Sequence, residues 1–348
     1  MDITTVADDL IVAHHGTRVI TLRDLRPGTT YTIAPQDGDS PPIEVTTLDR
    51  PSGELLCRLA TVNDVHFGET GCGQVDDDPG GPIIYPEPGE PPYPETMNRG
   101  AVAEMVELDS GGSPLAAVIV KGDLSNDGQP AEWAAFEACY RPAFGPRLHV
   151  VRGNHDAYRG QHEYAGDEWI ELPGLAVALI DTAIAHSSTG TISADQIEWL
   201  DAHAASADRP VIVMGHHQQW IDPGRGSAGR SDDYFGLHPD ASDALDAVAG
   251  RRPRIIAYTA GHTHRHRVRE MACGIPSVEV GCVKDFPGTW AEYRVYEGGV
   301  TQVVHRISTP QALHWSERCR HLYSDFGMDY SAYALGGLEE RCFNIELR

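Results

Sequence analysis

The stretch "RLHVVRGNHDAYRG" at residues 147–160 joins an apolar, strand-like run directly to Gly153, Asn154, His155 and Asp156. Glycine, asparagine and aspartate are common in turns and helix caps, so these residues could simply end a strand. Loops at strand ends are also where binding and catalytic groups are usually placed. This cluster alone does not distinguish a turn from a site, and the rest of the chain has to supply its partners.

The region around this stretch alternates apolar strands with helical segments from Leu55 onward, which is typical of a layered α/β domain. Seven segments are predicted as strands, at 55–63, 115–121, 147–151, 175–181, 210–215, 254–260 and 277–282. Four segments are predicted as helices, at 94–108, 131–140, 193–205 and 241–249. The third helix begins with Ser193 and Gln196 in capping-box spacing. A β-hairpin is predicted around Gly298 and Gly299.

The first fifty residues alternate apolar and polar positions between turn residues, which predicts short antiparallel strands. In "LRPGTTYTI", Tyr31 stands at the spacing of the tyrosine corner found in fibronectin-like sandwiches, although it could equally be an ordinary strand aromatic. We therefore divide the chain into a reduced fibronectin-like β-module at 1–50, a main domain at 51–310 and a C-terminal helical tail at 311–348.

In the tail, Trp315, Cys319, Leu322 and Phe326 recur at helical spacing and predict an amphipathic helix. We expect its apolar stripe to pack on its own domain, with a subunit contact, and hence a homodimer, as the alternative. Two long connections, 67–93 and 218–239, are rich in Gly, Pro and Asp. Connections of this length are either disordered or lids over a site.

Composition and charge narrow the class of protein. The chain of 348 residues is 41% hydrophobic and can bury a large core. The net charge of −24, from 27 Lys plus Arg against 51 Asp plus Glu, would repel long nucleic acids and anionic membranes. Seven scattered cysteines without C-x-x-C spacing predict reduced thiols. With no apolar run of about eighteen residues and an acidic first decade, we expect a cytoplasmic protein.

Five of the predicted strands end in side chains that can bind metals. These are Asp64 and His66 after the first strand, Asp123 after the second, Asn154 after the third, His216 with His217 after the fifth, and His262 with His264 after the sixth. The strand ends of an α/β sheet share one edge, so these groups would converge in one crevice.

The donor types indicate which metals would bind. Carboxylates, an amide oxygen and neutral imidazoles suit borderline metals such as Mn, Fe, Zn or Co, whereas Mg or Ca would favour an all-oxygen site. Seven ligands are too many for one tetrahedral centre, and an aspartate can bridge two ions. Two ions therefore fit better than one.

Each motif alone is weak, but the ordered set "DVH", "GDLSN", "GNHD", "GHH" and "GHTH" over residues 64–264 closely resembles the calcineurin-like metallophosphoesterases. The resemblance is greatest to the branch of class III cyclic-nucleotide phosphodiesterases and glycerophosphodiesterases. It implies a four-layer α/β sandwich of two mixed sheets flanked by helices, with the metallophosphoesterase catalytic domain at 51–310.

The resemblance also implies roles for individual residues. Asp64, His66 and His264 would hold one ion, Asn154, His216 and His262 the other, and Asp123 would bridge them, with Mn, Fe or Zn as the metals. His216 is favoured over His217 because the family's ligand directly follows the strand. His155 would face the substrate and protonate or stabilise the leaving oxygen, while a hydroxide that bridges both metals attacks phosphorus.

One departure from the family pattern concerns the support of His155. Where many members carry an aspartate that orients this histidine, the chain has Asn126, followed by Asp127. An amide cannot stabilise an imidazolium as a carboxylate does, so either His155 is less basic or Asp127 substitutes. Asp156 belongs to the same shell of candidates, and Arg159, Arg225 and Arg230 are candidates for contact with a substrate phosphate.

Three functions remain open at this point. A metal-dependent phosphodiesterase that acts on a small soluble substrate is favoured. A phosphomonoesterase or protein phosphatase could use the same centre. An inactive metal-binding regulatory protein is the third, and the complete ligand set together with His155 argues against it.

Overall fold

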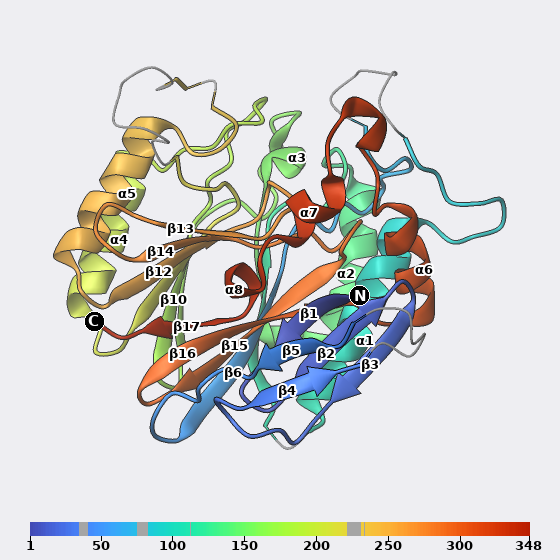
Figure 1. Cartoon of the computed structure of the whole chain (residues 1–348). Coiled ribbons are helices and arrows are strands. Elements are labelled where there is room, and N and C mark those ends of the chain that lie inside the picture. Colours follow the sequence, from blue (N-terminus) through green and yellow to red (C-terminus); the bar gives the residue numbers. More distant parts are fainter. Residues whose placement is uncertain (35–40, 75–82, 112, 221–230, 233) are drawn as a thin grey trace.

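The computed structural model describes residues 1–34, 41–74, 83–111, 113–220, 231–232 and 234–348. Two six-stranded mixed sheets pack face to face, as the four-layer prediction requires (Figure 1). The first sheet contains β6 (Leu55–Val62), β7 (Leu115–Lys121), β8 (Leu148–Val151), β15 (Thr289–Tyr296), β16 (Gly299–Arg306) and β17 (Phe343–Glu346). The second contains β9 (Glu168–Leu172), β10 (Leu175–Leu179), β11 (Val211–Met214), β12 (Ile255–Ala260), β13 (Arg267–Glu270) and β14 (Pro276–Glu279).

Strand order places the parallel strands where the candidate site residues begin. The first sheet runs β17-β16-β15-β6-β7-β8, with β6, β7 and β8 parallel to one another. The second runs β13-β14-β12-β11-β10-β9, with β10, β11, β12 and β14 parallel. The seven predicted strands all form within a few residues of their expected ends. The short edge strands β9, β13 and β17 were not predicted.

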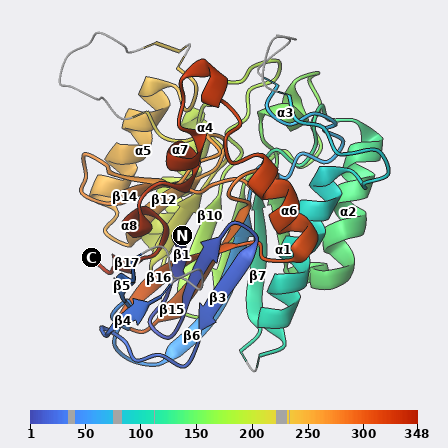
Figure 2. The same ribbon diagram turned by 45° about the vertical axis from the view of Figure 1, so that its right-hand side comes forward.

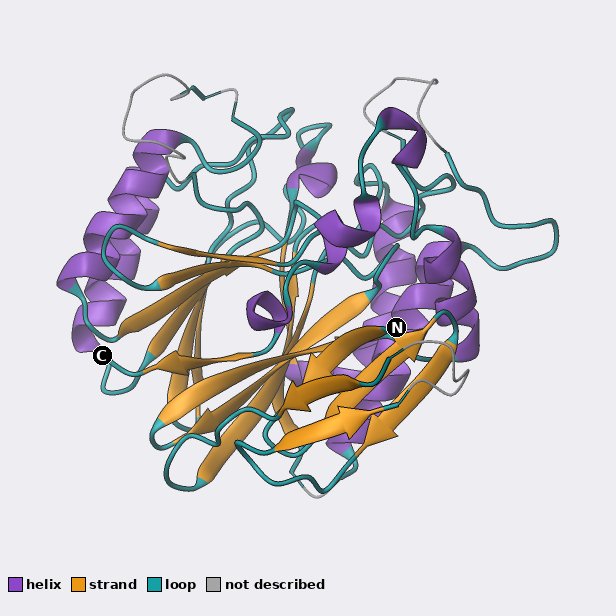
Figure 3. Ribbon diagram, viewed as in Figure 1, coloured by secondary structure: helices purple, strands orange, loops and turns teal. Residues whose placement is uncertain are grey.

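Helices cover the outer faces of both sheets (Figure 3). The long helices are α1 (Tyr93–Asp109), α2 (Pro130–Phe144), α4 (Ala194–Ser206), α5 (Pro239–Arg251) and α6 (Pro310–Arg318). The short ones are α3 (Asn154–Ala157), α7 (Tyr330–Leu335), α8 (Leu338–Arg341) and two 3-10 turns, η1 (Gly145–Arg147) and η2 (Ser324–Phe326). At the start of α4, Ser193 Oγ accepts from the backbone N–H of Gln196 at 3.2 Å, which confirms the predicted capping box.

Three apolar cores hold the layers together. One lies between the sheets, where Leu59 and Ile119 of the first sheet meet the face of Val177 and Ile212. The second packs α1, α2 and α6 on the first sheet, and the third packs α4 and α5 on the second. Every residue of β10 and β11 is buried, because each central strand faces an apolar core on both sides.

The N-terminal residues form a small antiparallel β-module. Its strands are β1 (Asp2–Val6), β2 (Ile11–His15), β3 (Arg18–Leu22), β4 (Thr30–Ile33) and β5 (Ile43–Thr46). The Arg26 backbone N–H donates to the Tyr31 hydroxyl at 3.0 Å, which is the hydrogen bond that defines a tyrosine corner. The module lies against the outer side of β15 and β16 (Figure 2), and Thr5 Oγ1 donates to the Val304 carbonyl.

The tail differs from the single amphipathic helix expected from its sequence. Helix α6 ends at Arg318, and β17 then adds a strand antiparallel to β16. Trp315, Cys319 and Leu322 are buried in the core of α1 and α2, as expected, but Phe326 is 65% exposed. Among the described residues, no helix is both long and apolar enough to span a bilayer.

Candidate metal centre

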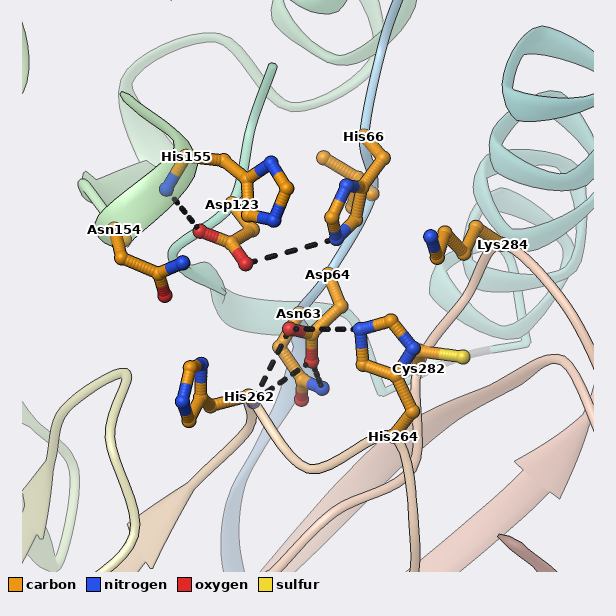
Figure 4. A network of polar contacts seen from close by, with 12 residues as sticks. Asn63, Asp64, His66, Asp123, Asn154, His155, His262, His264, Cys282 and Lys284 are labelled. Atoms are coloured by element: carbon orange, nitrogen blue, oxygen red, sulfur yellow. Dashed lines mark hydrogen bonds and ion pairs between the residues drawn. The ribbon is translucent and has the colours of Figure 1, made fainter. Parts of the chain in front are cut away.

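The candidate ligands follow the carboxyl ends of parallel strands in both sheets. Asp64, Asp123 and Asn154 come after β6, β7 and β8, while the histidines of the "GHH" and "GHTH" motifs come after β11 and β12. These groups meet at the same edge of the sandwich, where Figure 4 shows the side chains of Asp64, His66, Asp123, Asn154, His262 and His264 close together. The structure thus assembles in one place the groups that the sequence distributes over 200 residues.

The backbone at these strand ends is unusual. Five candidate ligands have a positive φ, namely Asp64 (53°), His66 (49°), Asp123 (50°), His262 (68°) and His264 (54°). Non-glycine residues rarely adopt the left-handed region, and each instance costs about 1–3 kcal/mol. Such a cluster at one site indicates that the fold holds these side chains in place at the expense of local stability.

Glycines in three of the motifs are explained by close contact between loops. A Cβ at Gly153 would lie 2.2 Å from Asp123 Oδ1 and 2.4 Å from Asp123 N. A Cβ at Gly122 would lie 2.4 Å from His216 Nδ1, and one at Gly261 would lie 2.7 Å from Asp64 Oδ2. Each of these glycines therefore lets one ligand loop touch a ligand from another loop.

The donor atoms form overlapping groups whose members lie within 4.8 Å of one another. Three of the five groups consist of candidate ligands alone: Asp64 with His66 and His264, Asp64 with Asp123 and His216, and His216 with His217 and His262. The other two are His66 with Asp123 and His155, and His264 with Cys282 and Asp285. Asp123 Oδ2 lies 3.2 Å from His216 Nε2 and 3.6 Å from His66 Nε2. The Asp123 carboxylate therefore lies between the group that contains His66 and the group that contains His216 and His262. Asn154 Oδ1 lies 3.0 Å from His216 Nε2.

The donor set fits a pair of metal ions. The Nε2 atoms of His66, His217 and His262 are buried and have no hydrogen-bond partner among the described residues. Burial lowers the pKa of His66 and of His262 well below the usual value, so both are neutral and able to coordinate. Unpaired imidazole nitrogens beside carboxylates are what a site for borderline cations requires.

The carboxylates give this site a strong attraction for positive charge. Burial opposes ionisation of Asp123, but His216 and His155 outweigh it and hold the pKa of the carboxyl well below its usual value. Burial likewise opposes protonation of His216, yet Asp123 raises the pKa of that imidazole to about 9. A cation, whether a proton or a metal, is thus stabilised between these two residues.

Both histidines of "GHH" point toward the cluster. His216 Nδ1 lies 2.9 Å from the Lys121 carbonyl, which leaves Nε2 facing Asp123. His217 Nδ1 lies 2.8 Å from Thr182 Oγ1, and the centroid of its ring lies 4.6 Å from that of His262. The preference for His216 as the ligand stays a prediction, and the structure makes His217 a further candidate.

The ring of His155 is oriented by a backbone carbonyl. Its Nδ1 lies 2.7 Å from the backbone carbonyl of Asn126, and its backbone N–H donates to Asp123 Oδ1 at 3.0 Å. Because a carbonyl only accepts, Nδ1 carries the proton and Nε2 is the atom left for substrate. Asp127 forms an ion pair with Arg159, and the alternative that its carboxylate substitutes in the support of His155 stays a prediction.

The side chain of Asp156 connects two of the ligand loops by hydrogen bonds. Its buried carboxylate accepts hydrogen bonds from the backbone N–H groups of Gly153, Leu124 and Ser125 at 2.9–3.0 Å. Burial, with Asp123 nearby, raises the pKa of this carboxyl. Asp156 therefore fixes the loop of Asp123 against the loop of Asn154.

Two outer carboxylates were missed by the sequence reasoning. Asp285 Oδ2 lies 3.5 Å from His264 Nδ1, and Glu69 Oε2 lies 3.5 Å from His66 Nδ1. Glu69 is also paired with the buried Lys284. A carboxylate behind a metal-binding imidazole orients the ring and strengthens it as a ligand. Glu69 could have been suspected from its position three residues after His66, whereas Asp285 lies in a loop that no motif marks.

A cavity of about 760 Å³ opens over the cluster. His66, Asp123, Asn154, His155, His262 and His264 line its floor, and Tyr158, Arg159 and Phe235 line part of its rim. The described parts of both long connections reach it, since Glu69, Gly73 and Phe235 belong to them. Arg225 and Arg230 lie outside the described residues, and a lid function for the two connections stays a prediction.

Comparison with known proteins agrees with this arrangement. The model of the calcineurin-like phosphoesterase family matches residues 57–266. The chain is 28% identical over 130 residues to a cAMP/cGMP dual specificity phosphodiesterase from Mycobacterium tuberculosis. That match covers 33% of this chain and 41% of the relative, so it spans less than half of the relative's length.

A solved structure shares the fold. A dimetal phosphatase from Danio rerio superposes with a TM-score of 0.53 at 14% identity, over 73% of this chain and 97% of that one. A purple acid phosphatase from yellow lupin (Lupinus luteus) seeds gives a TM-score of 0.48 at 13% identity, over 84% of this chain and 60% of that one.

Proposed function

Because the chain belongs to the calcineurin-like phosphoesterase family, we propose that it hydrolyses a small soluble phosphodiester with the help of two bound metal ions. The observation that carries the proposal is the position of Asp123, whose carboxylate lies between two groups of buried nitrogen and oxygen donors, with His155 beside it. A single carboxylate in this position can be shared by two ions.

Each side chain of the centre has a proposed role. Asp64, His66 and His264 would hold one ion, and Asn154, His216 and His262 the other, with Asp123 shared. The mixed donors suit Mn, Fe or Zn. When bound, the two ions would neutralise the phosphoryl oxygens and lower the pKa of water at the site.

His155 would handle the proton of the leaving group. Its Nδ1 proton is bound to the Asn126 carbonyl, so Nε2 is the atom that meets the leaving oxygen. An imidazolium in this position donates its proton as the ester bond breaks. Arg159, held at the rim by Asp127, is placed to contact a phosphate oxygen.

The charges of the cavity favour a diester over a monoester. Among the described residues that line it, the lysine and arginine side chains are Lys284 and Arg159, and each is already paired with a carboxylate, Glu69 or Asp127. A diester carries one negative charge, whereas a monoester dianion brings a second charge, for which the described lysine and arginine side chains of the cavity offer no unpaired cation. The acidic chain, at −24, also argues for a small substrate over a polyanion.

The alternative is a phosphomonoesterase or protein phosphatase with the same centre. The test measures the metal content of purified protein by elemental analysis. It also compares hydrolysis of bis(p-nitrophenyl) phosphate and p-nitrophenyl phosphate, each with added Mn and with a chelator. We expect about two metal equivalents and chelator-sensitive cleavage, with a higher kcat/KM for the diester.

Two outcomes would count against this proposal. A higher kcat/KM for the monoester would favour the alternative. Metal-loaded protein that hydrolyses neither ester would favour the inactive regulatory protein.

A further inference from the structure

The C-terminal segment forms one wall of the cavity over the metal centre. Tyr323, Met328, Tyr330 and Tyr333, all within 323–335, line the cavity together with Lys284 and Asp285. Tyr330 is 3% exposed, whereas Tyr323, Met328 and Tyr333 are half-buried and face the open space. A helical tail that served only to pack against its own domain would not need to reach the catalytic cavity.

The hydroxyl groups of this wall are already engaged by the protein. Tyr330 donates to Asp285 Oδ1 at 2.9 Å, Tyr333 to the Thr263 carbonyl at 2.9 Å and Tyr323 to the Gly73 carbonyl at 3.3 Å. The rings also contact one another, with centroids of Tyr323 and Tyr330 5.2 Å apart. What the wall offers to a ligand is therefore mainly carbon surface, held in a fixed position.

The other side of the cavity is polar. Helix α3 carries His155 there, followed by Tyr158 and by the ion pair of Arg159 with Asp127. Figure 4 shows Asn154, at the start of α3, and Lys284 on opposite sides of the cluster, and Lys284 lines the cavity together with the tyrosines of the C-terminal segment. The two ester substituents of a bound diester would thus meet different surroundings.

We propose that Tyr323, Met328 and Tyr333 form a subsite that binds the substituent retained on phosphorus and selects a flat, apolar group there. This inference rests on the proposed phosphodiesterase function. An in-line displacement puts the attacking oxygen opposite the leaving oxygen at His155, so the retained substituent points to the side, and the wall of Tyr323, Met328 and Tyr333 is an apolar surface of the same cavity that can receive it. Aromatic rings bind planar groups by stacking and by edge contacts.

The test compares two diesters that share one leaving group. Bis(p-nitrophenyl) phosphate retains an aryl group after cleavage, and methyl p-nitrophenyl phosphate retains a methyl group. For metal-loaded wild-type protein we expect a higher kcat/KM for the aryl ester. The ratio of the two kcat/KM values should fall roughly tenfold in Tyr333→Ala and in Met328→Ala, mainly through KM.

Two control variants separate binding from structural support. Tyr333→Phe loses the hydrogen bond to Thr263 but keeps the ring, so the ratio should stay as in the wild type. Phe326→Ala removes an exposed ring of the same segment that does not line the cavity, and it should also leave the ratio unchanged. The metal content of each variant is measured alongside.

The outcomes distinguish the subsite from the underlying function. Cleavage of both esters with an unchanged ratio in Tyr333→Ala and Met328→Ala would overturn the subsite alone. A ratio that falls equally in Tyr333→Phe would assign the effect to the Thr263 hydrogen bond and overturn it as well. Failure of metal-loaded wild type to cleave either ester would overturn the proposed function, and the subsite with it.

Discussion

Replacement of Asp285 by asparagine tests whether the outer carboxylate holds a metal ligand in place. In the wild type, Oδ2 lies 3.5 Å from His264 Nδ1, while Oδ1 accepts from the Tyr330 hydroxyl at 2.9 Å and from the Cys282 thiol at 3.0 Å. Asparagine keeps an oxygen for the last two donors. The oxygen that faces the imidazole becomes an amide that donates, so His264 loses its acceptor while the shape of the site is retained.

The expected magnitude follows from this contact. Loss of the partner behind a metal-binding histidine typically weakens metal affinity about 10- to 100-fold, which is roughly 1.4–2.7 kcal/mol. Asp285 is 2% exposed, so bulk water cannot easily replace the lost acceptor. His264 belongs to the donor group with Asp64 and His66, and we therefore expect one of the two ions to be weakened much more than the other.

Competition with a metal-binding dye at constant pH, first with Mn and then with Zn, gives the two dissociation constants. Asp127→Asn is the matched control, because Asp127 also lines the cavity but is paired with Arg159 instead of an imidazole. We expect this control to bind both ions as the wild type does. Unchanged binding in Asp285→Asn, or equal weakening of both ions, would refute the idea that this carboxylate positions His264.

Other variants test further parts of the structure. The His155→Ala variant should keep both metals and lose about 10²–10⁴-fold in kcat, because the role of His155 is proton transfer. The Asp123→Asn variant should lose metal as well as activity. Equal metal loss in the two variants, measured by elemental analysis, would contradict these roles. The Gly153→Ala variant places a Cβ 2.2 Å from Asp123 Oδ1. It should lower the free energy of unfolding by about 1–3 kcal/mol and should also lower the metal content. Wild-type values for both quantities would show that the two loops can move apart without cost. Burial raises the pKa of Glu104 from 4.5 to about 7, so the folded state holds this proton more tightly and stability is lost as pH rises through that range, by roughly 3 kcal/mol. Urea unfolding at several pH values should show this slope in the wild type and a flatter profile in Glu104→Gln, and identical profiles would argue against the assignment.

Much of the fold was predictable because the central strands are short apolar runs with clear ends. The strands before Asp64 and Asp123 are mostly buried on both faces, and the polar residue that ends each run marks a strand end in sequence and in space. The edge strand β17 lacks this contrast, since its burial alternates and its pairing with β16 depends on the path of the tail.

The inner part of the candidate site was predictable for the same reason, while its outer part was not. Each candidate ligand lies within four residues of the end of a strand, so periodicity and motif identify it together. The acceptor for His155 is the backbone carbonyl of Asn126. Every residue has a backbone carbonyl, so the sequence does not mark the one that is used. Asp285 and Tyr333 reach the centre from loops and from the tail, whose paths depend on tertiary packing. The roles of all these residues stay predictions until variants are measured.

The division of the ligands between two sheets has a consequence for how the centre matures. The His262 amide donates to Asp64 at 3.1 Å, although the two residues are 198 positions apart and follow strands of different sheets. Neither sheet alone carries both donor groups, and contacts between such distant segments form late in folding. Metal ions bound as we propose would therefore find a complete site only after the sandwich has closed. The metal supply that the finished protein meets, and not capture by the nascent chain, would then select which ions it holds.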